Sequence, residues 1–159
     1  MTYTTTPGTM FAQDLQWYAA NRLVSANSEI TFAIQPANPS QSGNVQIKLA
    51  MPAADFEELP EDCEIIYQNS LVSDNSAVCE TDLESNTFIL SNLLNDRYIY
   101  DEFAWIEFSI DDIKMPSSSR PTGDYYIEYY DNIDGVYRLV DTVTATDKLR
   151  AIPGGLFDV

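Results

Sequence analysis

The chain contains no histidine, and only 8 of its 159 residues are lysine or arginine, against 25 aspartates and glutamates. Without histidine, a Ser-His-Asp or Cys-His nucleophile system and a His-ligated zinc or copper centre are excluded. The formal net charge of −17 repels phosphate backbones and anionic lipid surfaces, which excludes nucleic acid as a partner. Because the residues available for catalysis are so few, we predict that the protein is not an enzyme.

Cysteine is also scarce, and no apolar run is long enough to insert into a membrane. The two cysteines, Cys63 and Cys79, match neither a CxxC redox motif nor a zinc knuckle. An even pair in an acidic, strand-rich chain predicts one disulfide, and with it an extracellular or cell-surface location. Two buried free thiols in a cytosolic domain are the alternative.

The dominant pattern in the sequence is an alternation of apolar and polar residues with a period of two, which is typical of strands with one buried face. It is clearest in residues 30–34, 45–51, 104–111 and 125–130. We expect ten apolar side chains of these segments to share one core. They are Ile30, Phe32, Ile34, Val45, Ile47, Leu49, Ile106, Phe108, Ile110 and Ile127.

Turn signals separate the alternating segments. Residues 36–43 are rich in Pro, Asn, Ser and Gly, and residues 131–135 end in Asp-Gly, which favours a tight hairpin. Residues 53–59 favour a short helical turn, because acids lie near its N-terminus. With seven to nine short strands and no long helix, the sequence predicts an all-β, antiparallel β-sandwich.

The last residues of the chain echo the first. Residues 7–11 read PGTMF, and residues 153–157 read PGGLF. Either this is coincidence or a second copy of the first strand begins here, as in tandem modules and strand-donating filament subunits. We therefore predict one domain over residues 1–147, with residues 148–159 as a linker or the start of a following module. The expected contacts with copies of the chain or neighbouring modules are Pro153, Leu156 and Phe157.

Three aspartates around a tyrosine-rich hairpin are candidates for a cation site: Asp124, Asp131 and Asp134. Calcium binds several carboxylate and carbonyl oxygens that lie close together. However, the segment lacks the alternating acids and the distal glutamate of an EF-hand loop, and an ordinary Asp-Gly hairpin also explains it. Apart from this candidate calcium ion, no cofactor is expected.

An acidic run covers Glu57, Glu58, Glu61, Asp62 and Glu64. Paired carboxylates can hydrolyse glycosidic bonds, but such pairs are distant in sequence. A contiguous run is more typical of a solvated loop.

Aromatic side chains on outward strand faces could form a platform for a sugar. The candidates are Trp17, Tyr18, Trp105, Tyr126 and Tyr130. Aromatic residues on strands are more often part of the core or of contacts between modules, and both interpretations stay open.

Residues 31–52, TFAIQPANPSQSGNVQIKLAMP, resemble the opening of Ig-like β-sandwich repeats in very large extracellular proteins, notably of ciliate protists. The Cys63/Cys79 pair and residues 113–118 are similar to the same modules, and the resemblance extends from about Pro7 to Thr146. The chain departs from the pattern at residues 42–44, where Ser-Gly-Asn replaces paired glycines. The positions that carry the motif are Phe32, Pro36, Asn38, Pro39, Gly43 and Pro52.

The resemblance implies a structural or adhesive surface module and gives no catalytic residues. We therefore predict an Ig-like sandwich that serves as an extracellular structural module or filament subunit, building end-to-end assemblies through its termini. The alternative is a surface binding module for carbohydrate or for a calcium-dependent partner. Exposed coplanar aromatics beside a groove would favour the alternative, and two carboxylates facing across a cleft would favour an enzyme.

Overall fold

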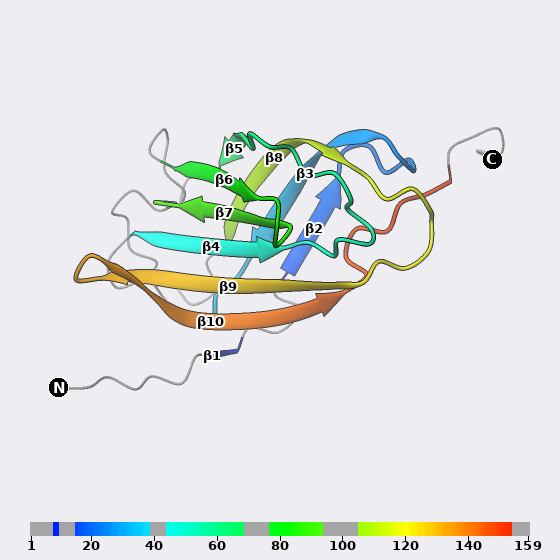
Figure 1. The fold of residues 1–159 in the computed structure, drawn as a ribbon. Coiled ribbons are helices and arrows are strands. Elements are labelled where there is room, and N and C mark those ends of the chain that lie inside the picture. Colours follow the sequence, from blue (N-terminus) through cyan, green and yellow to red (C-terminus); the bar gives the residue numbers. More distant parts are fainter. Residues whose placement is uncertain (1–7, 10–14, 39–43, 69–76, 94–104, 154–159) are drawn as a thin grey trace.

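The structure, a computed structural model, describes residues 8–9, 15–38, 44–68, 77–93 and 105–153. These residues form ten strands (Figure 1), and none of them forms a helix that could cross a membrane. The strands are β1 (Gly8–Thr9), β2 (Leu15–Ala19), β3 (Asn27–Ile34), β4 (Val45–Ala50), β5 (Ile65–Gln68), β6 (Val78–Asp82), β7 (Thr87–Ser91), β8 (Ile106–Lys114), β9 (Asp124–Ile133) and β10 (Val136–Thr146).

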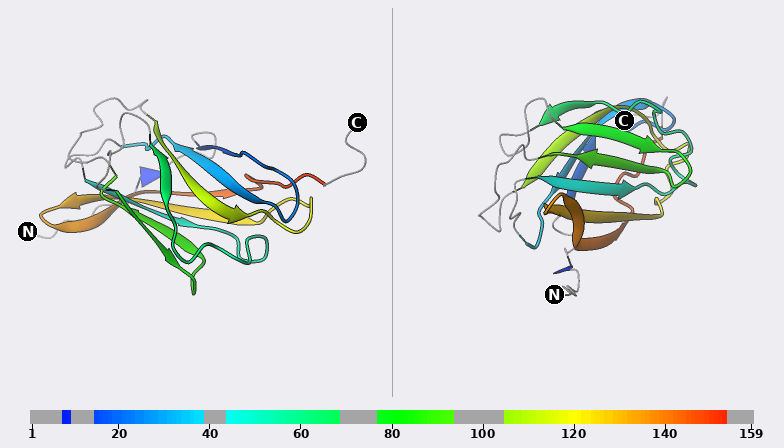
Figure 2. Two further views of the ribbon diagram at one scale, coloured as in Figure 1. Left: turned by 90° about the horizontal axis from the view of Figure 1, so that it is seen from above. Right: turned by 60° about the vertical axis from the view of Figure 1, so that its left-hand side comes forward.

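The strands form two sheets that pack face to face (Figures 1 and 2). One sheet has the order β1-β10-β9-β4-β7-β6, and the other has the order β2-β3-β8-β5. Every neighbouring pair is antiparallel except the two-residue strand β1, which runs parallel to β10. The predicted all-β antiparallel sandwich is confirmed.

The core lies between the sheets and contains all ten side chains that the alternation predicts, each of them fully buried. Register explains how they meet, since Phe32 lies opposite Phe108 and Leu49 lies opposite Ile127. The Phe32 and Phe108 rings stack with centroids 5.5 Å apart. Because side chains alternate strictly across a strand, a slip of one residue would expose the whole set.

The expected helical turn at residues 53–59 is limited to one hydrogen-bonded turn. The Phe56 N–H donates to the Pro52 carbonyl oxygen at 2.9 Å, and the chain then continues without helical hydrogen bonds. Phe56 and Leu59 are both buried. Their burial favours an irregular segment over a helix, because the segment must direct both side chains into the core.

The Asp-Gly signal gives the predicted hairpin between β9 and β10. Asp134 and Gly135 have φ angles of 53° and 81°, and Ile133 pairs with Val136. Two successive residues with positive φ form the tight turn that best matches the twist of two antiparallel strands. Glycine supplies the second position without steric cost.

The packed part of the chain continues beyond the expected boundary at residue 147. Leu149 and Ala151 are buried in the core. Ile152 donates its N–H to the Arg22 oxygen at 2.7 Å, and its own oxygen accepts from the Val24 N–H at 3.0 Å. Residues 148–152 therefore belong to this domain, whereas Leu156 and Phe157 lie outside the described residues.

Candidate functional site

The predicted disulfide between Cys63 and Cys79 is confirmed. Cys79 lies on β6, the edge strand of the larger sheet, and Cys63 comes just before β5, the edge strand of the smaller one. Their Cα atoms are 5.6 Å apart, and both residues pack against the core. The bond therefore fastens the two sheets together along one side of the sandwich.

Acidic residues flank both cysteines of this disulfide in the sequence. Glu57, Glu58, Glu61, Asp62 and Glu64 are all exposed, and so are Glu80 and Asp82 on β6. Charges along an edge strand hinder pairing with the strands of another molecule, and this effect is strongest between copies of the same acidic chain. The structure thus supports the interpretation of the acidic run as a solvated surface.

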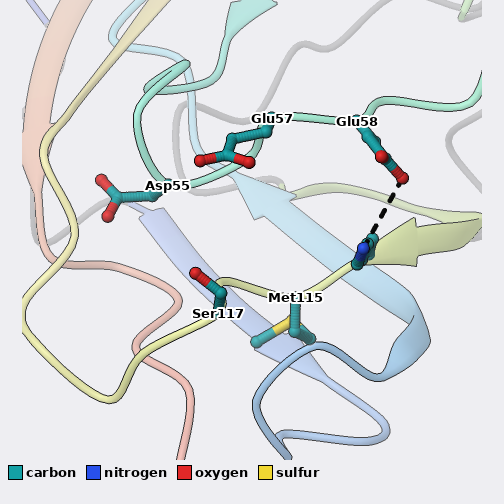
Figure 3. A pocket seen from close by; sticks show the side chains of 6 residues that line it. Asp55, Glu57, Glu58, Met115 and Ser117 are labelled. Atoms are coloured by element: carbon teal, nitrogen blue, oxygen red, sulfur yellow. Dashed lines mark ion pairs between the residues drawn. The ribbon is translucent and has the colours of Figure 1, made fainter.

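A small pocket of about 40 Å³ lies beside this acidic run and is lined by acidic and basic side chains (Figure 3). Lys114 pairs with Glu58 at 3.7 Å on one side of the pocket. On the other side, the buried carboxylate of Asp55 accepts the Gly123 N–H at 2.8 Å and lies 3.5 Å from the Arg120 Nε. Asp55 therefore holds the loop before β9, and the pocket has room for only a few water molecules.

The structure does not bring the three candidate calcium ligands together. Asp124 is exposed at the start of β9 and accepts the Thr146 hydroxyl, Asp131 is buried near the end of the strand, and Asp134 is exposed in the hairpin turn. At about 3.3 Å per residue, Asp124 and Asp131 are roughly 23 Å apart. No group of three or more His, Cys, Asp or Glu residues in the described segments could hold a metal ion.

The burial of the Asp131 and Asp141 carboxylates was not predicted from the sequence. Asp141 is fully buried, and its two oxygens accept the backbone N–H and the side-chain Nδ2 of Asn38 at 3.1 and 2.8 Å. Asp131 is 3% exposed. The burial of Asp131 could have been predicted from the sequence, because Asp131 continues the inward-facing phase of Ile127 and Tyr129 on β9. The Asn38–Asp141 contact fixes the chain after β3 against the β-bulge at Val140 on β10.

The aromatic candidates separate into two groups. Trp17 is only 8% exposed, and its ring packs edge-on against Phe32 and Tyr125 at 5.1 and 5.3 Å. Trp17 therefore belongs to the core and is not part of an outward-facing aromatic surface that could bind a sugar. Tyr18 is 57% and Tyr126 is 42% exposed, while Trp105 and Tyr130 are half-buried.

Tyr126 and Tyr130 project from the outer face of the larger sheet. They lie on the same outward phase of β9, roughly 13 Å apart at the usual rise per residue. Lys48 on β4 lies 5.0 Å from the centroid of the Tyr130 ring and opposite Glu128 in register. Burial, together with a hydrogen bond and the charge of Glu128, raises the pKa of Tyr130 to about 12. This face presents aromatic rings among neutral or paired side chains.

The side of the sandwich opposite the disulfide is closed by residues 147–152, which we call the terminal latch. The latch leaves β10 and runs parallel to the chain that follows β2, with Ile152 opposite Leu23. Lys148 Nζ donates to the Leu15 oxygen at 3.0 Å, and burial lowers the pKa of Lys148.

The start of the latch is held by a cluster of polar contacts. Asp147 accepts the Thr122 N–H at 3.1 Å and pairs with the Arg150 guanidinium at 2.5 Å. The hydrogen bond from Arg150 lowers the pKa of Asp147, although partial desolvation opposes the shift. The Tyr125 hydroxyl donates to Thr122 Oγ1 at 2.8 Å inside the core, and burial raises the pKa of Tyr125. The cluster joins the latch to the loop before β9.

No known protein family and no curated protein matches the sequence. Among solved structures, the fold is similar to a collagen-binding domain from a Staphylococcus aureus adhesin, with a TM-score of 0.45, 11% identity and coverage of 84% of this chain and 95% of that chain. It is also similar to a cohesin module from a Clostridium perfringens family 33 glycoside hydrolase, with a TM-score of 0.44, 10% identity and coverage of 86% and 96%.

A third similar structure is domains D2 and D3 of the major pilin SpaD from Corynebacterium diphtheriae. Its TM-score is 0.37 at 6% identity, with 83% of this chain and 52% of that chain covered. At such identities the likeness concerns the β-sandwich fold alone. The resemblance to ciliate proteins in particular stays a prediction.

Proposed function

We propose that this chain is a non-catalytic structural module of an extracellular or cell-surface assembly, in which copies or neighbouring modules join end to end through their termini. The observation that carries the proposal is the Cys63–Cys79 disulfide, because such bonds persist mainly in oxidising compartments outside the cytosol. The absence of histidine and the net charge of −17 also favour a solvated, unreactive surface.

The uneven distribution of charge supports contacts between successive copies. Three of the few basic side chains, Arg22, Lys148 and Arg150, lie at the terminal latch, where Arg22 Nη2 contacts the Arg150 oxygen at 3.4 Å. Much of the remaining surface is acidic, so the acidic face of another copy is attracted to the latch end. Pro153 is exposed directly after the latch. In the proposal, Leu156 and Phe157 anchor the contact, since apolar residues left in water favour association.

The proposal is tested by removing residues 153–159, which leaves Ile152 and the whole latch in place. We expect the shortened chain to keep its circular-dichroism spectrum and melting temperature, while sedimentation velocity shows weaker self-association than in the full chain. A matched variant, Leu156→Ser with Phe157→Ser, keeps the chain length and removes only the apolar anchors. If the full chain stays monomeric at every concentration, or if the deletion leaves its association unchanged, the end-to-end proposal fails.

A second candidate function is binding of a neutral polysaccharide along the outer face of the larger sheet. The observation that favours it is the pair Tyr126 and Tyr130 on one outward phase of β9, each with neutral residues opposite it on β4 and β10. The charges between the two rings, Lys48 and Glu128, lie opposite each other in register. Electrophoresis through gels that contain a neutral polysaccharide should then retard the wild type but not Tyr126→Ala. Equal mobility of both proteins in mannan, xylan and hydroxyethyl-cellulose gels would rule this function out.

A further inference from the structure

The chain runs in the same direction as its partner strand at both ends of the described fold. β1 is parallel to β10, with Gly8 opposite Asp141, and Ile152 is parallel to Leu23. β10 itself runs from the β9–β10 hairpin toward the end of the sandwich where the latch lies (Figure 1). Tension on the two ends of the chain therefore draws β1 back along β10 and draws the latch forward along residues 22–24.

We propose that the terminal latch bears tension, so that the module resists a force applied along the chain. This inference rests on the proposed function as a module within a continuous assembly, and it concerns a different part of the chain from the end-to-end contact. The latch connects the two sheets, because it leaves β10 of the larger sheet and bonds to the segment after β2 of the smaller one. A pull on the latch is thus resisted by both sheets.

The direction of the latch decides how its bonds respond to such a pull. Its hydrogen bonds from the Ile152 N–H to Arg22 and from the Val24 N–H to the Ile152 oxygen lie across the chain. Because the latch and residues 22–24 run parallel, a pull along the chain shears both hydrogen bonds at the same time. A pull perpendicular to the strands would instead break the two bonds one after the other. Leu149, which is 3% exposed, must also enter water before the latch can slide, and this adds an apolar cost to the same step.

The disulfide is a natural control, because it lies outside the path of the force. Cys63 and Cys79 fasten the β5 edge of one sheet to the β6 edge of the other, at the side of the sandwich opposite β1 and the latch. Their bond also encloses a loop with a sequence separation of 16. Breaking it adds roughly 50 Å to the length released on unfolding, from 16 residues at about 3.3–3.6 Å each less the 5.6 Å that already separates the two Cα atoms. Reduction should therefore change the released length without changing the force at which the latch gives way.

The test is single-molecule force spectroscopy on the full chain, held at its two termini by peptide handles. Forced unfolding is governed by the barrier to unfolding and is separate from equilibrium stability. We expect Ile152→Pro, which deletes the N–H donated to Arg22, to lose the high-force peak. Leu149→Val, a milder change, should lower that peak while the protein still folds. The double variant Cys63→Ser/Cys79→Ser should unfold more easily in urea and keep the wild-type peak force.

The inference fails if the wild type unfolds without a high-force peak. It also fails if Leu149→Val keeps the full peak, or if the cysteine variant loses as much force as the latch variants. These outcomes are separate from the sedimentation result, because the chain shortened after Ile152 retains the latch. A chain that keeps its peak force but does not associate would overturn the end-to-end contact and leave the tension-bearing latch in place.

Discussion

On one side of the sandwich β5 and β6 are joined by a disulfide, whereas on the other side β2 and β10 are joined by the terminal latch. The disulfide side is acidic and highly exposed. The latch side combines basic side chains with buried apolar ones, and β2 itself carries no charge. A covalent bond tolerates a surrounding surface of like charges, while a non-covalent closure needs apolar burial and paired polar groups. The acidic side of the sandwich is therefore closed by a covalent bond, and the side with apolar and basic residues is closed by non-covalent contacts.

The largest effect is expected from breaking the apolar packing on the latch side. Trp17→Ala removes a buried ring from between Phe32 and Tyr125 and should lower the free energy of unfolding by about 3–5 kcal/mol. Phe108→Ala in the centre of the core should cost a similar amount. Urea titrations followed by circular dichroism measure both. A loss below about 1 kcal/mol at either position would mean that its side chain does not pack as described.

Opening the disulfide side should have a smaller effect that stays on that side. Replacing Cys63 and Cys79 by serine opens a loop whose ends are 16 positions apart and should cost roughly 3 kcal/mol by the chain-entropy estimate. Amide hydrogen exchange should accelerate in β5 and β6 more than in β2. Thiol titration of the unfolded, unreduced wild type should detect no free thiol. Two free thiols, or uniform acceleration across both sheets, would contradict the comparison.

The smallest expected effect is the response of the latch to acid. Arg150 holds the pKa of Asp147 below its ordinary value in the folded protein. The stabilisation is therefore complete above the unfolded pKa of about 3.9 and is lost as the pH falls through the lower folded pKa. Between about pH 6 and pH 3, the difference in urea midpoint between wild type and Asp147→Asn should shrink. A difference that is constant with pH would show that Asp147 does not act through its charge.

The core and the disulfide were more predictable from the sequence than the latch side. Alternation between residues 30 and 127 identified the core, since strict period-two side-chain geometry carries over directly into burial. The disulfide was also predictable, because two cysteines can form only one bond within the chain. Both signals are contained in short stretches of sequence.

The latch left no such signal. Residues 147–152 alternate over too few positions to predict a strand: Leu149 and Ala151 are buried with Arg150 exposed between them, and a single β-bridge holds the segment rather than a ladder. Trp17 is a candidate for an outward aromatic face, although it shares the phase of Leu15 on β2 and both side chains are buried. The pairing of Asn38 with Asp141 depends on two segments far apart in sequence, and nothing local to either one predicts it.

The two closures also differ in when they can form as the chain is made. Cys63 and Cys79 lie only 16 positions apart, so the loop between them closes early and at a modest entropic cost. Leu23 meets Ile152 only after almost all of the domain has been synthesised. Until then residues 22–24 lack their hydrogen-bond partner Ile152, and the Leu15 oxygen lacks the Lys148 ammonium. During biosynthesis the side closed last, and not the one rich in exposed acids, is where a nascent chain is open to mispairing and to recognition by chaperones.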